Sequence, residues 1–478
     1  MTVVSYGQLR SADPGRWRDT AVAWRSWAAT AGRWAAELRA HAARLRTVWT
    51  GSAADAATAC LAALLRRLTI FRLGCWAADQ ALSEFAAALA RARSLLPATP
   101  RPGGPGEVSD AVRAALALAA RADATATGRL AELAADDASP PAVDQPPCTA
   151  APAEVRRWWD GLSPAQRCWL LATEPGGIGM RDGVPAAARD LANRLVLDAL
   201  PTRHAGLDAL RDRLATGDGP RAYLMQLDLG GEGRAVVALG DPDRADNVLT
   251  QVPGMTADLA SYAGELARAE RIAVRAGELA PAASTSAILW LGYDAPDFLD
   301  EAASRAPADA GAVGLRRFQD GLRATHDGAP AHQTLLGHSY GSVVVGRAAA
   351  EEGLAADSVV FVGSPGVGVD AAADLRVPPG QVWASTSRAD IIQWAAVSPW
   401  SLAEDVVLSR AVPAGALLAF ARPEDDLYFG TNPSDPAFGA RVFASPPGAG
   451  HLGYWDTGGA ALDALTNIAV GRGDVIPR

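Results

Sequence analysis

The sequence contains no lysine, so arginine supplies all 44 of its basic side chains. Acidic residues outnumber the arginines, and the net charge of -9 is spread through the 478 residues with no basic patch that stands out. Nucleic-acid-binding proteins carry such a patch, because much of their affinity comes from contacts with phosphates. We therefore expect no nucleic acid partner.

Long uncharged apolar runs are also missing. A membrane-spanning helix needs about 18 or more such residues, and the longest candidate, residues 61–90, is interrupted by Arg66, Arg67, Arg72 and Asp79. Residues 1–10 lack the apolar core of a secretion signal. We expect a protein without a transmembrane segment, either cytoplasmic or exported without a conventional signal peptide.

Cysteine is scarce, and the four cysteines match no metal-binding spacing: Cys60, Cys75, Cys148 and Cys168. If Cys60 and Cys75 share one helix, they lie about 22 Å apart along it, which is too far for a disulfide. Free thiols in a cytoplasmic setting are the simpler interpretation. The sequence also lacks a phosphate-binding loop, a dinucleotide-binding fingerprint and a metal-ligand cluster. We expect no cofactor and no metal.

Helical periodicity dominates residues 13–96. Large apolar residues recur there at spacings of three, four and seven and fall on one stripe: Trp17, Trp24, Trp27, Trp34, Leu38 and Leu45. Trp49-Thr50-Gly51 interrupts the pattern, and Ser52 with Asp55 has the sequence of an N-cap followed by an acidic first turn. We predict an antiparallel hairpin of two long helices, with a further helix near 108–135.

Two proline-rich stretches, 97–106 and 136–152, have the composition of connectors. With 49% hydrophobic residues the chain can build two domains. We predict a helical domain over residues 1–135, a linker over 136–153 and a second domain over 154–478.

Short apolar runs alternate with helical patterns through the second domain. The predicted strands are 222–228, 234–239, 247–252, 286–291, 333–337, 358–362, 381–384 and 441–444. Alternation of this kind is typical of a mostly parallel sheet covered by helices on both faces. The predicted fold class is α/β, specifically the α/β-hydrolase fold, preceded by an all-α hairpin domain.

The central motif of the second domain is Gly337-His338-Ser339-Tyr340-Gly341, which follows an apolar run and precedes a Val/Ala-rich segment. In a G-x-S-x-G elbow the serine occupies a strained turn between strand and helix, and the glycines allow close approach of neighbouring backbone. An ordinary turn between two buried strands is the alternative, since residues 343–345 are valines with high strand propensity.

Chain order identifies candidate partners for Ser339, because in this fold the nucleophile, the acid and the histidine follow in that sequence. Of six histidines only His451 comes after Ser339, in a glycine-rich loop, although a loop histidine can also lack a catalytic role. Asp390 follows the predicted strand 381–384 and would orient the imidazole. The alternatives are that Asp390 caps a helix and that Asp370 or Asp374 is the acid.

An acyl-transfer site also needs backbone donors for the oxyanion. One candidate is the amide of Tyr340, directly after the serine. The second should come from residues 254–256, with Met255 favoured, because Pro253 has no N–H to donate. We interpret Asp294 as a hydrogen-bonding residue of a pocket-lining loop.

Several motifs carry a more specific resemblance. Trp158-Trp159, Leu162-Ser163-Pro164, the turn at 182–185 and the Arg-Asp-x-Ala-Asn-Arg helix at 189–194 resemble actinobacterial α/β-hydrolases catalogued as domain of unknown function 1023, over most of residues 155–470. The resemblance implies an acidic residue at Asp390 and a histidine before an aromatic. The polar residues of 189–194 fit a helix that salt-bridges the core better than one that binds substrate.

The N-terminal hairpin resembles the Trp-x-Gly helical hairpins of actinobacterial type VII secretion, over roughly the first 100 residues. That resemblance implies a helical protein partner. The associated export signal, a tyrosine followed four positions later by an acidic residue, is not evident near 82–96.

The sequence therefore predicts a serine hydrolase, carboxylesterase-like or lipase-like, with a small-molecule or lipid-like acyl ester as substrate. Cleavage of an amide or a thioester is the alternative. Ser339 would attack, His451 would shuttle the proton and Asp390 would orient His451. The alternative hypothesis is a type VII secretion-associated interaction protein whose hydrolase domain is a scaffold or toxin-like.

Overall fold

The computed structural model describes residues 5–97, 110–133, 138–141, 144–200, 204–216, 219–297, 299–302, 304–390, 392, 427–448 and 450–477. These residues group into two compact units. The first comprises Met1–Ala150, Glu154–Leu200 and Leu214–Tyr223, and the second Ala151–Ala153, Pro201–Arg213 and Leu224–Arg478. Within the described ranges, no helix has both the length and the apolar character that crossing a bilayer requires.

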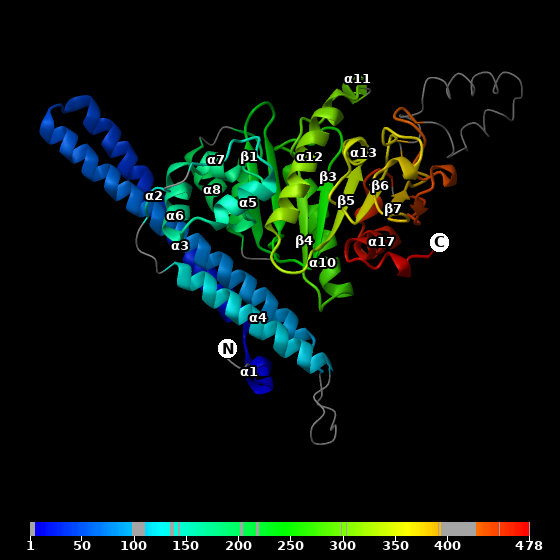
Figure 1. The fold of residues 1–478 in the computed structure, drawn as a ribbon, viewed down its shortest axis with the longest axis horizontal. Coiled ribbons are helices and arrows are strands. Elements are labelled where there is room, and N and C mark those ends of the chain that lie inside the picture. Colours follow the sequence, from blue (N-terminus) through cyan, green and yellow to red (C-terminus); the bar gives the residue numbers. More distant parts are fainter. Residues whose placement is uncertain are drawn as a thin grey trace, which may run out of the picture. The chain divides into compact units, whose positions relative to one another are not determined.

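The first unit is helical. Its helices are α1 (Tyr6–Ser11), α2 (Pro14–Val48), α3 (Ser52–Ser94), α4 (Asp110–Glu132), α5 (Pro152–Asp160), α6 (Pro164–Thr173), α7 (Pro175–Gly179) and α8 (Ala186–Ala199). Helices α2 and α3 form a long hairpin (Figure 1). The expected N-cap at Ser52 is wrong by one residue, because Gly51 is the N-cap at φ 101° and only glycine adopts that angle without strain.

Small residues form the seam of this hairpin. The buried residues of α2 after Pro14 are all alanines: Ala21, Ala28, Ala31, Ala35 and Ala42. The tryptophans of the predicted stripe lie beside the seam and remain 38–55% exposed. Alanine lets two helix backbones approach closely, so the large rings are left outside the contact.

Helices α5, α6, α7 and α8 pack against the hairpin through a shared apolar cluster. Trp76 of α3 lies in this cluster with Val155, Trp159, Leu170 and Leu191. This packing explains why Glu154–Leu200 belongs to the first compact unit, although the domain boundary at residue 154 stays a prediction. Cys60 and Cys75 both lie on α3, and none of the four cysteines forms a disulfide in the described part of the chain.

The second unit is built on an eight-stranded sheet with the order β1-β2-β4-β3-β5-β6-β7-β8. The strands are β1 (Ala222–Asp228), β2 (Arg234–Leu239), β3 (Asn247–Val252), β4 (Thr285–Trp290), β5 (His332–His338), β6 (Ser358–Val362), β7 (Val382–Ser385) and β8 (Arg441–Val442). From β4 to β8 all neighbours are parallel, whereas β2 pairs antiparallel with β4. The predicted α/β-hydrolase fold is confirmed.

Helices cover this sheet. The longer ones are α10 (Tyr262–Leu279), α12 (Ala306–Thr325), α13 (Gly341–Glu351) and α17 (Ala460–Ala469); the shorter elements are α9 (Leu207–Ala215), α11 (Leu299–Ala302), η1 (Ala372–Asp374), η2 (Pro436–Phe438), η3 (Gly453–Trp455) and η4 (Gly473–Val475). Helix α12 packs with α13, and α10 packs with α17 (Figure 1).

The parallel strands end in register at one edge of the sheet. Val252 of β3 pairs with Gly337 of β5, and His338 pairs with Val362 of β6, which pairs with Ser385 of β7. The loops that follow these strands therefore open at the same edge, where open α/β sheets bind their ligands.

Candidate active site

Ser339 occupies the turn between β5 and α13 with a positive φ of 53°. The flanking glycines are sterically required: a Cβ on Gly337 would lie 2.6 Å from Cα of Ser342, and one on Gly341 would lie 2.3 Å from the carbonyl oxygen of Val252. Residues 343–345 lie in α13, so the predicted order of strand, turn and helix is confirmed and the two-strand alternative is wrong.

The loop after β3 lies directly against Ser339. A Cβ on Gly254 would come within 2.5 Å of the serine Cβ and 3.0 Å of its Oγ. The loop is held at both ends, since Pro253 accepts a 2.7 Å hydrogen bond from the Tyr293 hydroxyl and the Thr256 N–H donates to Pro296. Thr256 is thus already engaged, which leaves the Gly254 and Met255 amides as loop donors.

Asp390 and His451 meet in a partly buried hydrogen bond. Nδ1 of His451 lies 2.7 Å from Oδ1 of Asp390, and the aspartate is fully buried. Burial raises the pKa of Asp390, but hydrogen bonds from His451 and Tyr454 outweigh it, so the pKa lies below the usual range. The acid is a carboxylate at neutral pH, and therefore Nδ1 carries the proton and Nε2 is left able to accept one.

Tyr454 completes this contact, and sequence reasoning missed it. Its hydroxyl donates to Oδ2 of Asp390 at 2.6 Å and accepts from the Ser387 N–H at 2.9 Å. The only hint in the sequence is the aromatic pair at 454–455, three residues after His451. The tyrosine thus holds Oδ2 of the carboxylate, while His451 contacts Oδ1.

His338, also missed, packs against the ring of His451 with a centroid distance of 4.6 Å. Its Nε2 donates to the backbone carbonyl of His451 at 2.9 Å, since a carbonyl oxygen can only accept. Burial, together with the charges of His451 and Arg268, lowers the pKa of His338 to about 3. The neutral ring of His338, at the end of β5, therefore packs against the loop that carries His451.

The hydroxyl of Ser339 forms no hydrogen bond within the described part of the chain. His451 contacts His338, the residue directly before the serine, through its ring and its backbone carbonyl. Loose serine–histidine contacts are common in unliganded active sites and tighten when substrate binds.

The other acids considered from the sequence lie elsewhere. Asp370 accepts a hydrogen bond from the Thr431 N–H, and Asp374 lies in η1. Asp294 forms an ion pair with Arg234, in keeping with its interpretation as a loop residue. None of the three contacts His451 in the described structure. Nor do the described residues contain three or more His, Cys, Asp or Glu side chains that could share a metal ion.

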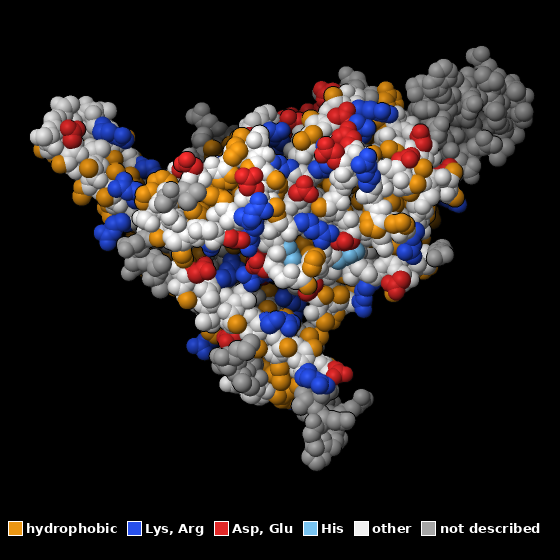
Figure 2. Space-filling model, in the orientation of Figure 1, with side chains coloured by type: hydrophobic (Ala, Val, Ile, Leu, Met, Phe, Trp, Pro, Cys, Tyr) orange, Lys and Arg blue, Asp and Glu red, His pale blue; other side chains and the backbone are white. Residues whose placement is uncertain are grey.

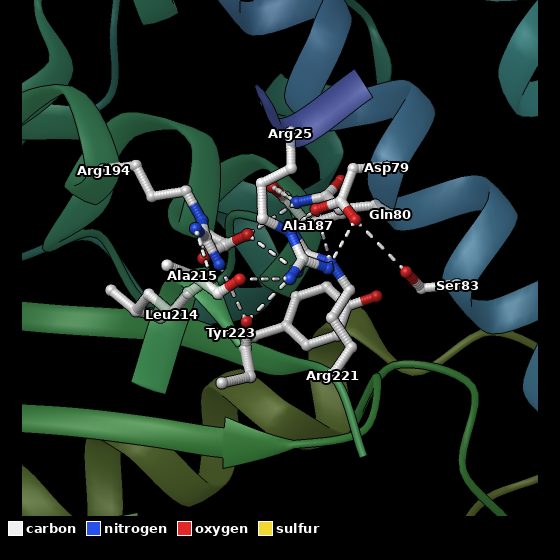
Figure 3. A network of polar contacts seen from close by, with 12 residues as sticks. Arg25, Asp79, Gln80, Ser83, Ala187, Arg194, Leu214, Ala215, Arg221 and Tyr223 are labelled. Carbon is white, nitrogen blue, oxygen red and sulfur yellow. Dashed lines mark hydrogen bonds and ion pairs between the residues drawn. The ribbon is translucent and has the colours of Figure 1, made fainter. Parts of the chain in front are cut away.

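The polar residues of α8 form a buried ion network in the first unit (Figure 3). Asp190 pairs with Arg194 and with Arg221 at 2.8 and 2.9 Å. Arg221 also pairs with Asp79 of α3, which in turn pairs with Arg25 of α2. These contacts account for the α8 motif by salt-bridging, as expected from the sequence.

Comparison with known proteins supports the fold class. A family model described as alpha/beta hydrolase matches residues 228–399. The uncharacterized protein Rv2079 of Mycobacterium tuberculosis is 33% identical over 386 residues, which cover 69% of this chain and 57% of the relative. The uncharacterized protein Mb0988c of Mycobacterium bovis is 36% identical over 189 residues, covering 37% of this chain and 70% of the relative. No solved structure matches the chain.

Proposed function

The chain belongs to the alpha/beta hydrolase family, and we propose that it is a serine hydrolase that cleaves a carboxylic ester. One observation carries the proposal: a serine with positive φ sits at the strand end next to a loop whose histidine is hydrogen-bonded to a buried carboxylate. The matched region spans 57% of the length of Rv2079.

The chemistry follows from the roles of three side chains. Ser339 Oγ would attack the carbonyl carbon while Nε2 of His451 takes its proton, and Asp390 would hold the imidazole in the required tautomer and stabilise its cation. Return of that proton to the leaving alkoxide releases an alcohol and leaves an acyl-serine. A water molecule, deprotonated by His451, then releases the acid.

Negative charge on the carbonyl oxygen needs donors fixed in advance. The N–H of Tyr340 lies at the start of α13, where the helix dipole adds to its effect. The N–H of Met255 is the second proposed donor, supported by the two hydrogen bonds that hold its loop against Ser339. We propose a small-molecule or lipid-like ester as the substrate, because ester cleavage requires the least activation of the leaving group.

Intact-mass labelling with a fluorophosphonate probe tests this proposal. The full chain should gain one adduct, which Ser339→Ala and His451→Ala should abolish. Ser342→Ala is the matched control, because this serine lies in the same elbow but is fully buried with its hydroxyl bound to the Gly337 carbonyl. Absence of labelling in folded wild-type protein would refute the proposal, and an ester panel would define the substrate after a positive result.

A second function is favoured by one observation on the hairpin. Trp17, Trp24 and Trp27 are 38%, 39% and 55% exposed, as expected for a surface that meets a partner. We propose as the alternative that the hairpin, resembling those of type VII secretion, binds a helical protein and that the hydrolase domain, which resembles domain of unknown function 1023, acts as a scaffold. Pull-down with the full chain and with Trp27→Ala would test it.

A further inference from the structure

The distal half of the α2–α3 hairpin, residues 33–71, is basic in a chain that is acidic overall. It contains six exposed arginines and two acidic residues, a net charge of +4 against -9 for the chain. None of the six forms an ion pair within the described residues. The arginines are Arg33, Arg39, Arg44, Arg46, Arg66 and Arg67.

Large apolar side chains are exposed between these arginines. Trp34 is 51% exposed, Val48 82%, Trp49 43%, Leu64 44% and Phe71 45%. The buried positions of this half are three alanines, Ala35, Ala42 and Ala54. Basic and apolar side chains are therefore both exposed on this half of the hairpin, part of which is visible in Figure 2.

We propose that the distal half of the hairpin docks on an anionic lipid surface. Tryptophan prefers the boundary between headgroups and acyl chains, and arginine is attracted by the negative potential of anionic lipids. Burial of exposed apolar side chains in the same boundary lowers the free energy of binding. Basic and apolar side chains together are typical of helices that lie on a membrane without crossing it. The inference concerns the hairpin alone and is independent of the proposed esterase activity.

The position of the apolar residues favours a lipid surface over a helical partner at this end. The most exposed of them, Val48, is the last residue of α2, and Trp49 follows in the turn. A partner helix that packs side by side buries the flanks of α2 and α3 but leaves the end of the hairpin exposed. A lipid surface can bury that end. A second copy of the chain is disfavoured because two surfaces of charge +4 repel each other.

Co-sedimentation with vesicles tests the proposal. The full chain should bind vesicles of phosphatidylcholine mixed with phosphatidylglycerol, should bind pure phosphatidylcholine far more weakly, and should be released by salt. The double variant R44Q/R46Q should bind roughly 25-fold more weakly, from a loss of about fivefold per arginine.

The matched control is R16Q/R18Q, which removes two exposed arginines about 40 Å away along the same helix and should retain binding. The variant V48S/W49S should lose binding while circular dichroism shows its helices intact. Equal binding to neutral vesicles, no binding, or equal losses in both arginine variants would overturn the proposal. So would a dimer in light scattering that V48S/W49S converts to monomer, which would assign the surface to a second copy.

Discussion

Nδ1 of His451 donates a 2.7 Å hydrogen bond to the buried carboxylate of Asp390. Asp390→Asn should therefore lower kcat/KM for an activated ester about 10³- to 10⁴-fold, because the amide favours the wrong imidazole tautomer and cannot stabilise its cation. Steady-state hydrolysis of a p-nitrophenyl ester measures this.

Asp370→Asn is the control for that substitution, since Asp370 is the acid considered as an alternative and it binds the Thr431 N–H instead of His451. Its kcat/KM should stay within about twofold of wild type, as expected for a residue outside the Asp390–His451 contact. If Asp370→Asn were the variant that lost activity, the assignment of the acid would be wrong.

Tyr454→Phe should weaken the same contact without breaking it. The hydroxyl donates to Oδ2 of Asp390, and a hydrogen bond to a charged group contributes about 1.5–3 kcal/mol. Without it the carboxylate loses one of the two side-chain contacts that fix its position beside His451. We expect kcat/KM for the same ester to fall roughly tenfold, the lower end of that energy range.

Normalising kcat/KM to the fraction of protein that a fluorophosphonate probe labels separates this role from a structural one. A tyrosine that only stabilised the fold would lower the labelled fraction and leave kcat/KM per labelled serine unchanged. Tyr428→Phe, an exposed tyrosine, should alter neither quantity.

Gly254→Ala should obstruct Ser339, the proposed nucleophile, by sterics alone. The added Cβ would lie 2.5 Å from the Cβ of Ser339, so the loop or the serine must move. Misplacement of about 1 Å at a reacting atom can cost roughly 100-fold in rate, and the rate of fluorophosphonate labelling should fall by about that factor. Gly264→Ala on α10 has open space at its Cβ and should label at the wild-type rate.

The sequence predicted the strands and the elbow well because both depend on local pattern. Apolar runs delimit β3, β5 and β6, and glycine spacing marks the turn around Ser339. The candidate acid and histidine were reachable from chain order, although their catalytic roles stay a prediction. The contacts of Tyr454 and His338 were not reachable, since they join segments more than 60 residues apart in the sequence.

The hairpin shows a different limit of sequence reasoning. Helical periodicity places the tryptophans and the alanines of α2 on neighbouring stripes, and it does not say which stripe faces α3. Close packing of α2 against α3 favours alanine at the interface, and Trp34 remains exposed to solvent. Likewise, the salt bridges of Asp190 to Arg221 depend on segments brought together only by the fold.

Asp79→Asn should destabilise the first unit. Asp79 is fully buried and accepts from Arg25 and Arg221, so its neutralisation removes the counter-charge of Arg25 and leaves the buried Arg221 and Arg194 to share the Asp190 carboxylate. Breaking a buried pair in this way costs about 3–5 kcal/mol of the free energy of unfolding. Asp55→Asn, at the exposed first turn of the same helix, should cost less than about 1 kcal/mol in the same urea titration. Equal losses in the two variants would contradict a stabilising role for the network.

His338 should make the stability of the protein depend on pH. Its pKa falls from 6.5 to about 3 in the folded state, so between these values the unfolded chain binds the extra proton. The free energy of unfolding should therefore decrease as the pH falls through this window, by up to about 1.4 kcal/mol per pH unit from this group.

His338→Gln keeps a donor for the His451 carbonyl but cannot titrate, so the free energy of unfolding from urea titrations should depend less steeply on pH across this window. His41→Gln, on the exposed face of α2, should leave the wild-type slope unchanged. A wild-type slope in His338→Gln would mean that the ring is protonated in the folded protein, and the neutral contact with His451 would then be wrong.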